Sequence, residues 1–177
     1  MQNDYKKIIS IYIKAKDDSK PHLMKSVFSE NAILKMKVQT ENISFPADVI
    51  GVDDITEALV RNFNNTYENI YTVCLSDTVE QRGDVLACRW LVGMTDKASG
   101  LPRVGFGDYQ WIFDGEGSGL VSHLTIAIDD MIVLPLEFQS DVISWCANLS
   151  YPWVLSSEVV ASMPDIDLLA NVRSLAA

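Results

Sequence analysis

The run from Val85 to Met94 constrains the fold more than any other part of this sequence, because Arg89 is its only charged residue. A strand with one face in water alternates apolar with polar residues along its length. In this run the residues that point to one face and those that point to the other are both apolar, so we expect both faces of its sheet to be covered. Helices would cover the concave face, and either a second subunit or the C-terminal segment would cover the other face.

Further strand-like segments surround this run. A Gly83-Asp84 turn precedes it, and three glycines between residues 115 and 119 separate the last two segments of the group. Connections this short join antiparallel neighbours. We therefore predict an antiparallel meander that includes four further strands: Tyr71 to Leu75, Val79 to Gln81, Phe106 to Asp114 and Leu120 to Ile128.

Two stretches of the N-terminal half have helical periodicity. Apolar residues recur at three- and four-residue spacing from Tyr5 to Ile13 and from Ile55 to Phe63. Asp53 and Asp54 are placed to cap the second of these helices, just after Gly51. Each helix has one apolar stripe, which must pack against another element.

A further helix and a strand lie between these two stretches. Ser19 can start the helix, because Pro21 is tolerated in a first turn, and the helix would end near residues 29–31. Residues 32–38 then alternate as a strand and lead into a polar loop from Gln39 to Pro46. We thus expect three helices before the meander.

Helical composition returns beyond Met131. Pro135 opens a segment that reaches Leu149, and Ser156 or Ser157 starts another helix. The sequence contains no internal repeat and no linker, and a chain of 177 residues is long enough to bury one sizeable core. We expect a single α+β unit with helices at both ends of the chain.

The charge balance excludes several classes of partner. The chain has 24 acidic and 14 basic residues, and the resulting net charge of -10 repels nucleic acid backbones and anionic membranes. No apolar run reaches the roughly 20 residues that span a bilayer, and the N-terminus opens polar where a signal peptide is apolar. We expect a cytoplasmic protein that binds neither nucleic acid nor membrane.

Cysteine and histidine residues are too few and too scattered to suggest a metal site. Cys74, Cys88 and Cys146 have no C-x-x-C spacing, and His22 and His123 are the only histidines. We predict buried thiols, no bound metal and no cofactor.

The order of the segments resembles nuclear transport factor two-like proteins, and within them the SnoaL-like branch. The resemblance is carried by the helical segment from Tyr12 to Asn31 with its following strand, by Gly51 with Ile55, Leu59 and Phe63, and by the glycine-turned meander. It covers residues 5 to about 130. It implies a SnoaL-like cone domain over residues 1–130 and a helical C-terminal extension over residues 131–177, packed on the same domain.

The fold that this resemblance implies is α+β, with a curved antiparallel or mixed sheet wrapped around N-terminal helices as a cone-shaped barrel. Its pocket opens at the wide end. Members include isomerases, dehydratases, epoxide hydrolases, polyketide cyclases and noncatalytic binding domains, and many of them pair through the outer sheet face. We therefore expect a homodimer that binds a small apolar molecule.

Similarity to the ketosteroid isomerases of that superfamily implies that Tyr12, on the first helix, donates a hydrogen bond to the ligand. The same alignment places Met36 where those enzymes carry the carboxylate that moves a proton. Methionine cannot act as a general base, which argues against a steroid-type isomerisation. Either Tyr109 or Asp108 takes the place of a second acidic group, and the strand register decides which of the two points inward.

Two further residues have both a functional and a structural interpretation. His123 lies in the middle of a strand, where it could act as a general base, although strand histidines are more often structural. Arg89 either pairs with a buried acid such as Asp108 or binds an anionic group of a ligand.

These observations favour a small-molecule-binding protein with an apolar pocket. Acid–base lyase or isomerase chemistry would use Tyr12, Asp108 and His123. The alternative is a noncatalytic binding or assembly domain of the same fold. The other residues expected to contact the ligand are Met36, Phe63, Arg89, Tyr109 and Trp111.

Overall fold

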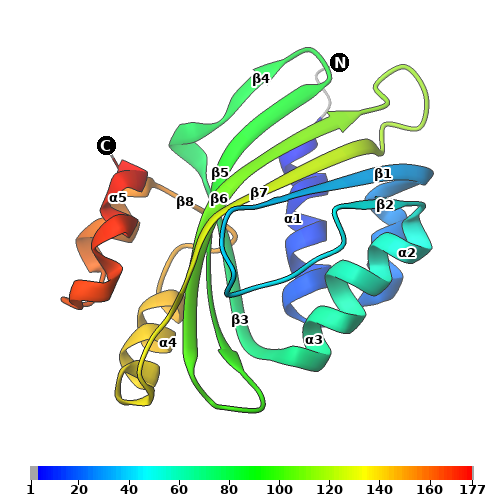
Figure 1. The fold of residues 1–177 in the computed structure, drawn as a ribbon. Helices are drawn as coiled ribbons and strands as arrows, with labels where there is room; N and C mark the ends of the chain where they lie inside the picture. Colours follow the sequence, from blue (N-terminus) through cyan, green and yellow to red (C-terminus); the bar gives the residue numbers. More distant parts are fainter. Residues whose placement is uncertain (1–3, 177) are drawn as a thin grey trace.

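Residues 4–176, which this computed structural model describes, contain one eight-stranded sheet with helices on both of its faces (Figure 1). The strands follow one another in the order β2-β1-β7-β6-β5-β3-β8, and β4 pairs with β5. Their bounds are Phe28–Val38 (β1), Asp48–Ile50 (β2), Tyr67–Leu75 (β3), Glu80–Arg82 (β4), Val85–Asp96 (β5), Pro102–Phe113 (β6), Val121–Val133 (β7) and Trp153–Val154 (β8).

The predicted meander is confirmed, because β3 pairs antiparallel with β5, β5 with β6, and β6 with β7. β1 lies parallel to β7, and β8 lies parallel to β3, so the sheet as a whole is mixed. Within the described chain the sheet ends at β2 and β8 and does not close into a complete barrel. The α+β fold with a curved mixed sheet around N-terminal helices is as predicted.

The N-terminal helices lie on the concave face of the sheet (Figure 1). They are α1 (Tyr5–Asp17), a 3-10 turn η1 (Pro21–Ser26), α2 (Val52–Thr56), a π-helical turn η2 (Glu57–Arg61) and α3 (Asn62–Thr66). Both predicted apolar stripes are buried there, with Ile9 and Ile13 from α1 and Ile55 and Leu59 from the second stretch in one core with the sheet. These helices are one of the two covers that the apolar strand requires.

The prediction of a helix from Ser19 to about residue 31 is wrong. The helical part is only η1, and β1 already begins at Phe28. Phe28 aligns with Val121 of β7, and the Val121 N–H donates to the Val27 carbonyl at 2.8 Å. Hydrogen bonding to the sheet thus takes over where helical periodicity alone would continue the helix.

The predicted cap of α2 is also wrong. Gly51, not Asp53 or Asp54, occupies the N-cap position, with no side-chain cap hydrogen bond. Its φ of 95° is a conformation that L side chains rarely adopt, which explains a glycine at this position. The two aspartates lie in the first turn, where their charge suits the positive end of the helix dipole.

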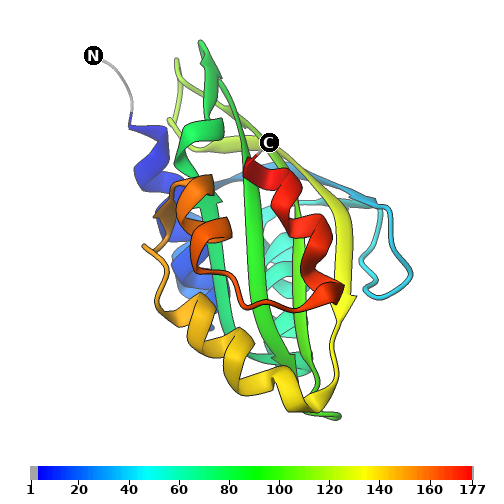
Figure 2. The same ribbon diagram turned by 90° about the vertical axis from the view of Figure 1, so that its left-hand side faces the viewer.

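The C-terminal segment covers the outer face of the sheet, as Figure 2 shows. It consists of a 3-10 turn η4 (Leu136–Phe138), α4 (Gln139–Ala147), α5 (Ser156–Ser162) and a 3-10 helix η5 (Asp167–Ala176). Leu91 and Phe106 of the sheet share one buried cluster with Trp145 of α4 and with Leu169 and Val172 of η5. The second cover of the apolar strand is therefore the C-terminal segment of the same chain.

Helix α4 packs directly on the backbone of the sheet. A Cβ added at Gly93 would lie 2.2 Å from Cys146 Sγ, a separation that real atoms do not reach. Glycine at this position therefore permits the close approach of helix and strand. In the described part of the chain, no helix is both long and apolar enough to cross a bilayer.

Two neighbouring leucines test whether the extension is part of the folding unit. Leu169 is fully buried, whereas Leu168 is 52% exposed. Leu169→Ala should lower the free energy of unfolding by about 2–5 kcal/mol, and Leu168→Ala by less than about 0.5 kcal/mol. Urea denaturation would measure both. Two equal, small effects would show that η5 does not contribute to the common core.

Candidate functional site

A cavity of about 40 Å³ lies between the concave face of the sheet and the N-terminal helices. Most of its wall is apolar, and the polar atoms come from few side chains. A space of this size accommodates only a very small molecule. Its lining residues are Tyr12, Lys16, Met36, Ile43, Phe45, Leu59, Phe63, Thr72, Trp90, Val92, Tyr109, Ile126, Ile128 and Met131.

Lys16 brings a buried positive charge to the cavity wall from the last turn of α1. Its Nζ lies 3.1 Å from Asp17 Oδ1 and donates to Thr72 Oγ1 at 2.6 Å. It also lies 4.8 Å from the centre of the Phe63 ring. An ammonium has three donors, so one remains after Asp17 and Thr72 are bound.

Asp17 is the counter-ion of Lys16 and faces away from the cavity. Besides the contact to Lys16, it accepts hydrogen bonds from the Thr72 backbone at 2.6 Å, from Thr72 Oγ1 at 2.9 Å and from the Tyr151 hydroxyl at 2.9 Å. Burial raises the pKa of the Asp17 carboxyl above its ordinary value, while Lys16 and Thr72 oppose that shift. Its oxygens are thus committed to holding Lys16 and Thr72 in place.

Two tyrosine hydroxyls meet at another part of the wall. Burial raises the pKa of Tyr12, and a hydrogen bond from Tyr109 opposes this shift. Burial also raises the pKa of Tyr109. Both hydroxyls therefore stay protonated at neutral pH, and since Tyr109 donates its only hydroxyl hydrogen to Tyr12, the Tyr12 hydroxyl is the one that can donate to a ligand.

Trp90 provides a donor that has no acceptor. Its ring lines the cavity and is 4% exposed, and its Nε1 is buried without a hydrogen-bond partner among residues 4–176. An indole N–H can only donate. The cavity thus combines an unsatisfied donor with a lysine and two tyrosines, and among its lining residues there is no carboxylate or imidazole.

Four of the residues expected at the site line this cavity: Tyr12, Met36, Phe63 and Tyr109. The register question is also answered, because Tyr109 points inward and its neighbour Asp108 points outward. Trp111 is fully buried behind the cavity, with its ring centre 5.1 Å from that of Tyr12. It supports Tyr12 and does not line the cavity.

The other three expected residues lie on the outer face of the sheet, apart from Tyr12. Arg89 Nε is 3.3 Å from Asp108 Oδ1, and Arg89 Nη2 is 3.4 Å from Asp129 Oδ2, so Arg89 does pair with Asp108, but this acid is exposed and not buried as expected. His123 is exposed, with Nδ1 3.1 Å from the Ser122 hydroxyl. Side chains alternate across a strand, so these positions cannot reach the cavity.

Lys16 and Thr72 were not identified as site residues from the sequence, and Trp90 fitted a core aromatic as well as a wall for a flat ligand. A signal for Lys16 was present, because it lies three residues after Ile13 and four after Tyr12, on the apolar stripe of α1. A charge on a buried stripe needs a partner, which Asp17 supplies. Among residues 4–176, no three His, Cys, Asp or Glu side chains come together as metal ligands.

The buried pair of Lys16 and Asp17 should make the two residues interdependent. Lys16→Met leaves the Asp17 carboxylate without its counter-ion and should cost about 3–5 kcal/mol, whereas the double variant with Asp17→Asn should cost clearly less than the two single changes together. Lys14→Met, on the exposed side of α1, is the matched control. Urea denaturation measures all four variants, and strictly additive effects would contradict the pairing.

The same variants should differ in their response to pH. The pKa of Asp17 in the folded protein is raised above its ordinary value of 3.8. Protonation of Asp17 therefore stabilises the fold below pH 3.8, and this contribution is lost as the pH rises through the folded-state pKa. The cost of Lys16→Met should therefore shrink towards pH 4, relative to the double variant.

In sequence, the chain matches no protein-family model and no curated protein. Its fold does match solved structures. A protein from Rhodopseudomonas palustris, provisionally described as an isomerase, matches with a TM-score of 0.60 and 15% identity over 79% of this chain and 98% of that chain. A nuclear transport factor two-like protein from Burkholderia thailandensis matches with a TM-score of 0.58 and 16% identity, over 73% of this chain and 92% of that chain.

A third structure adds a bound small molecule. It is a protein from Catenulispora acidiphila with a ketosteroid isomerase-like fold, in complex with trimethylamine, and it matches with a TM-score of 0.55 and 13% identity over 67% of this chain and 82% of that chain. Identities this low establish a common fold and leave the activity open. The chain therefore has the cone-shaped α+β fold of nuclear transport factor two-like proteins.

Proposed function

We propose that this protein binds a small, largely apolar molecule through an oxygen atom of that molecule. The observation that carries the proposal is the buried N–H of Trp90, a residue that lines the cavity, because this N–H lacks an acceptor among the described residues. A buried donor without a partner costs about 1–3 kcal/mol. An oxygen acceptor in the cavity would remove that cost.

The lining indicates the chemical class of the ligand. Leucine, isoleucine, valine, methionine and phenylalanine side chains suit an aliphatic or aromatic body. Lys16 and Asp17 neutralise each other, so the wall has donors but no net charge to attract an anion. A ketone, aldehyde or ether of low polarity fits this combination best.

The geometry supports binding better than catalysis. A lyase or isomerase needs a base beside its substrate, and the cavity lining of the described chain has no carboxylate or imidazole. Asp17, behind Lys16, already accepts several hydrogen bonds. We therefore favour a noncatalytic binding domain, with Tyr12 as a further donor beside Trp90.

An isomerase or cyclase role is the second candidate, and the fold match to a protein provisionally described as an isomerase favours it. In that case Lys16, Trp90 and the tyrosines would stabilise negative charge that develops on a substrate oxygen. The proton would then have to move through water or through a group of the substrate itself.

We also propose a cytoplasmic homodimer. Three buried free cysteines are typical of a reducing compartment. The extension leaves one half of the outer sheet face open, where Ile33 and Ile112 flank the exposed His123 on neighbouring strands. Pairing there should give a dimer in sedimentation equilibrium that His123→Asp weakens, whereas a wild-type monomer at all concentrations would contradict it.

Cyclopentanone and methylenecyclopentane test the oxygen acceptor, because they differ only in a C=O against a C=CH2 group. Cyclopentanone should move the Trp90 indole N–H resonance downfield in a nitrogen-15 correlation spectrum, and methylenecyclopentane should not. Trp90→Phe, which also assigns the resonance, should weaken binding of the ketone about two- to tenfold, the range for one net hydrogen bond.

The matched control is Trp145→Phe, since Trp145 belongs to the cluster on the outer face, donates to the Val159 carbonyl and lies outside the cavity lining. That variant should bind both probes as the wild type does. Ketone binding that leaves the Trp90 resonance unmoved, or no ketone binding at all, would refute the proposal.

A further inference from the structure

The hollow outside the cavity is much larger than the cavity itself. A groove of about 480 Å³ opens between loop residues 41–46, helix α3 and the strand ends at Asp96 and Arg103. Ile43, Phe45 and Phe63 line both the groove and the cavity. The side chains of the loop thus form a partition between two adjoining hollows.

The partition matters because the cavity on one side of it and the groove on the other differ greatly in volume. The cavity alone, at about 40 Å³, admits only a very small molecule. Sites for small molecules usually measure about 300–1,000 Å³. The groove, at about 480 Å³, already lies in that range, whereas the cavity reaches it only as one space with the groove.

We propose that the segment from Gln39 to Ala47 is a lid over one continuous site, and that the ligand is an elongated molecule with a second, neutral oxygen acceptor at its outer end. When the lid opens, this acceptor replaces the backbone carbonyl of Asn42 as the hydrogen-bond partner of Arg103. The inference rests on the proposed function, in which the inner oxygen binds near Trp90.

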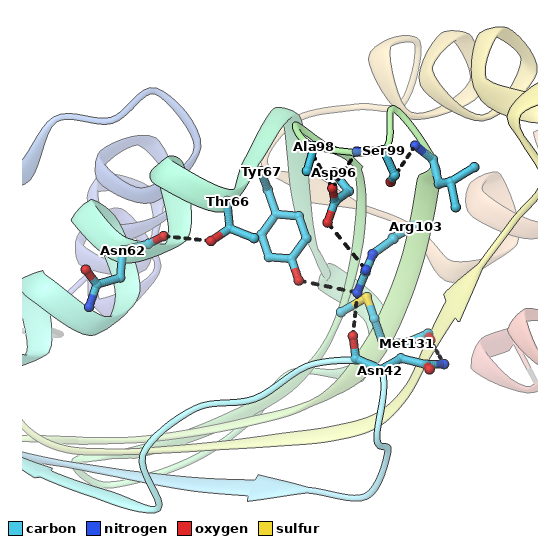
Figure 3. A network of polar contacts seen from close by, with 10 residues as sticks. Asn42, Asn62, Thr66, Tyr67, Asp96, Ala98, Ser99, Arg103 and Met131 are labelled. Carbon is cyan, nitrogen blue, oxygen red and sulfur yellow. Dashed lines mark hydrogen bonds and ion pairs between the residues drawn. The ribbon is translucent and has the colours of Figure 1, made fainter.

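Two hydrogen bonds at Asn42 hold the lid closed (Figure 3). Asn42 Nδ2 donates to the Met131 carbonyl at 2.7 Å, and Arg103 Nη1 donates to the Asn42 carbonyl. The two ends of the segment are tied to the sheet, by Met36 N–H to the Ala47 carbonyl and by Gln39 N–H to the Ile128 carbonyl, each at 2.9 Å. The middle can therefore move outward without breaking the sheet.

Arg103 stays in place when the lid leaves. Its Nη2 lies 3.4 Å from Asp96 Oδ2, its Nη1 lies 3.4 Å from the Tyr67 hydroxyl, and its guanidinium carbon lies 5.4 Å from the centre of the Tyr67 ring. The side chain is 17% exposed and lines the groove. Loss of the Asn42 carbonyl thus leaves a positioned donor at the mouth of the site.

The charges at the mouth favour a neutral acceptor. Asp96 compensates Arg103, and hydrogen bonds from the Ser99 and Ala98 backbone lower the pKa of Asp96 and keep it ionised. Glu41 adds a second carboxylate to the groove lining. An anionic ligand would meet repulsion here, whereas a carbonyl oxygen would accept from Arg103 as the Asn42 carbonyl does.

Two naphthalene probes test this inference with the full chain. 2,6-Diacetylnaphthalene has an oxygen at both ends, and 2-acetyl-6-ethylnaphthalene retains only one. Tryptophan fluorescence quenching should show the wild type binding the diacetyl probe about two- to tenfold more tightly. Arg103→Met should abolish this preference. Asn42→Ala should tighten both probes several-fold, because it removes a hydrogen bond that exists only with the lid closed.

Arg89→Met is the matched control, since it makes the same substitution on the outer face and should change neither affinity. In Arg103→Met, Asp96 keeps its backbone partners, and circular dichroism checks the fold. If Arg103→Met does not fold, Arg103→Lys takes its place in the experiment. Arg103→Lys should also lower the preference for the diacetyl probe.

Three results would overturn the inference. A preference that survives the changes at Arg103 would refute the outer acceptor site. Unchanged affinities in Asn42→Ala would refute the lid. Failure of both naphthalene probes to bind, while cyclopentanone still moves the Trp90 resonance, would show that the small cavity never opens and would leave the proposed function intact.

Discussion

The central strands of this sheet are apolar on both faces, and the rest of the structure depends on covering both. Leu86 and Val92 of β5 face the N-terminal helices, whereas Leu91 faces the C-terminal segment. Because the same chain supplies both covers, half of the outer face is unavailable to another subunit. What remains open is the charged half around Arg89 and His123.

The inner cover also creates the site. Helix α1 keeps its buried stripe to its last turn, so that the stripe ends in a lysine, and a buried lysine needs a counter-ion. Asp17 supplies it and is held in turn by Tyr151, a residue of the C-terminal extension. The extension therefore does more than cover the sheet, since it also fixes the charge pair at the cavity wall.

Periodicity predicted the larger features of the fold. The meander, the apolar stripes of α1 and of the stretch from Ile55 to Phe63, and the need for two covers all follow from alternation or helical spacing, which the sequence shows directly. Strands β2 and β8 have three and two residues, too few for any period. The start of β1 at Phe28 depends on pairing with β7, a contact between distant parts of the chain that local spacing does not reveal.

The site was predictable only in part, for a related reason. Asp108 and Tyr109 are neighbours, so a one-residue change of register exchanges their faces, and only the pairing with β5 and β7 fixes it. Tyr12 and Met36 could be placed because the resemblance to ketosteroid isomerases supplied an alignment for them. Trp90 had to be seen in three dimensions, since its significance is a missing acceptor and not a sequence pattern.

The most direct measurement is a crystal structure of the protein with cyclopentanone bound. The account predicts the ketone oxygen in the cavity, about 2.7–3.2 Å from Trp90 Nε1, with its ring against Phe63 and Ile126. A ketone bound elsewhere, or a cavity that remains filled by its own side chains at saturating ketone, would contradict it.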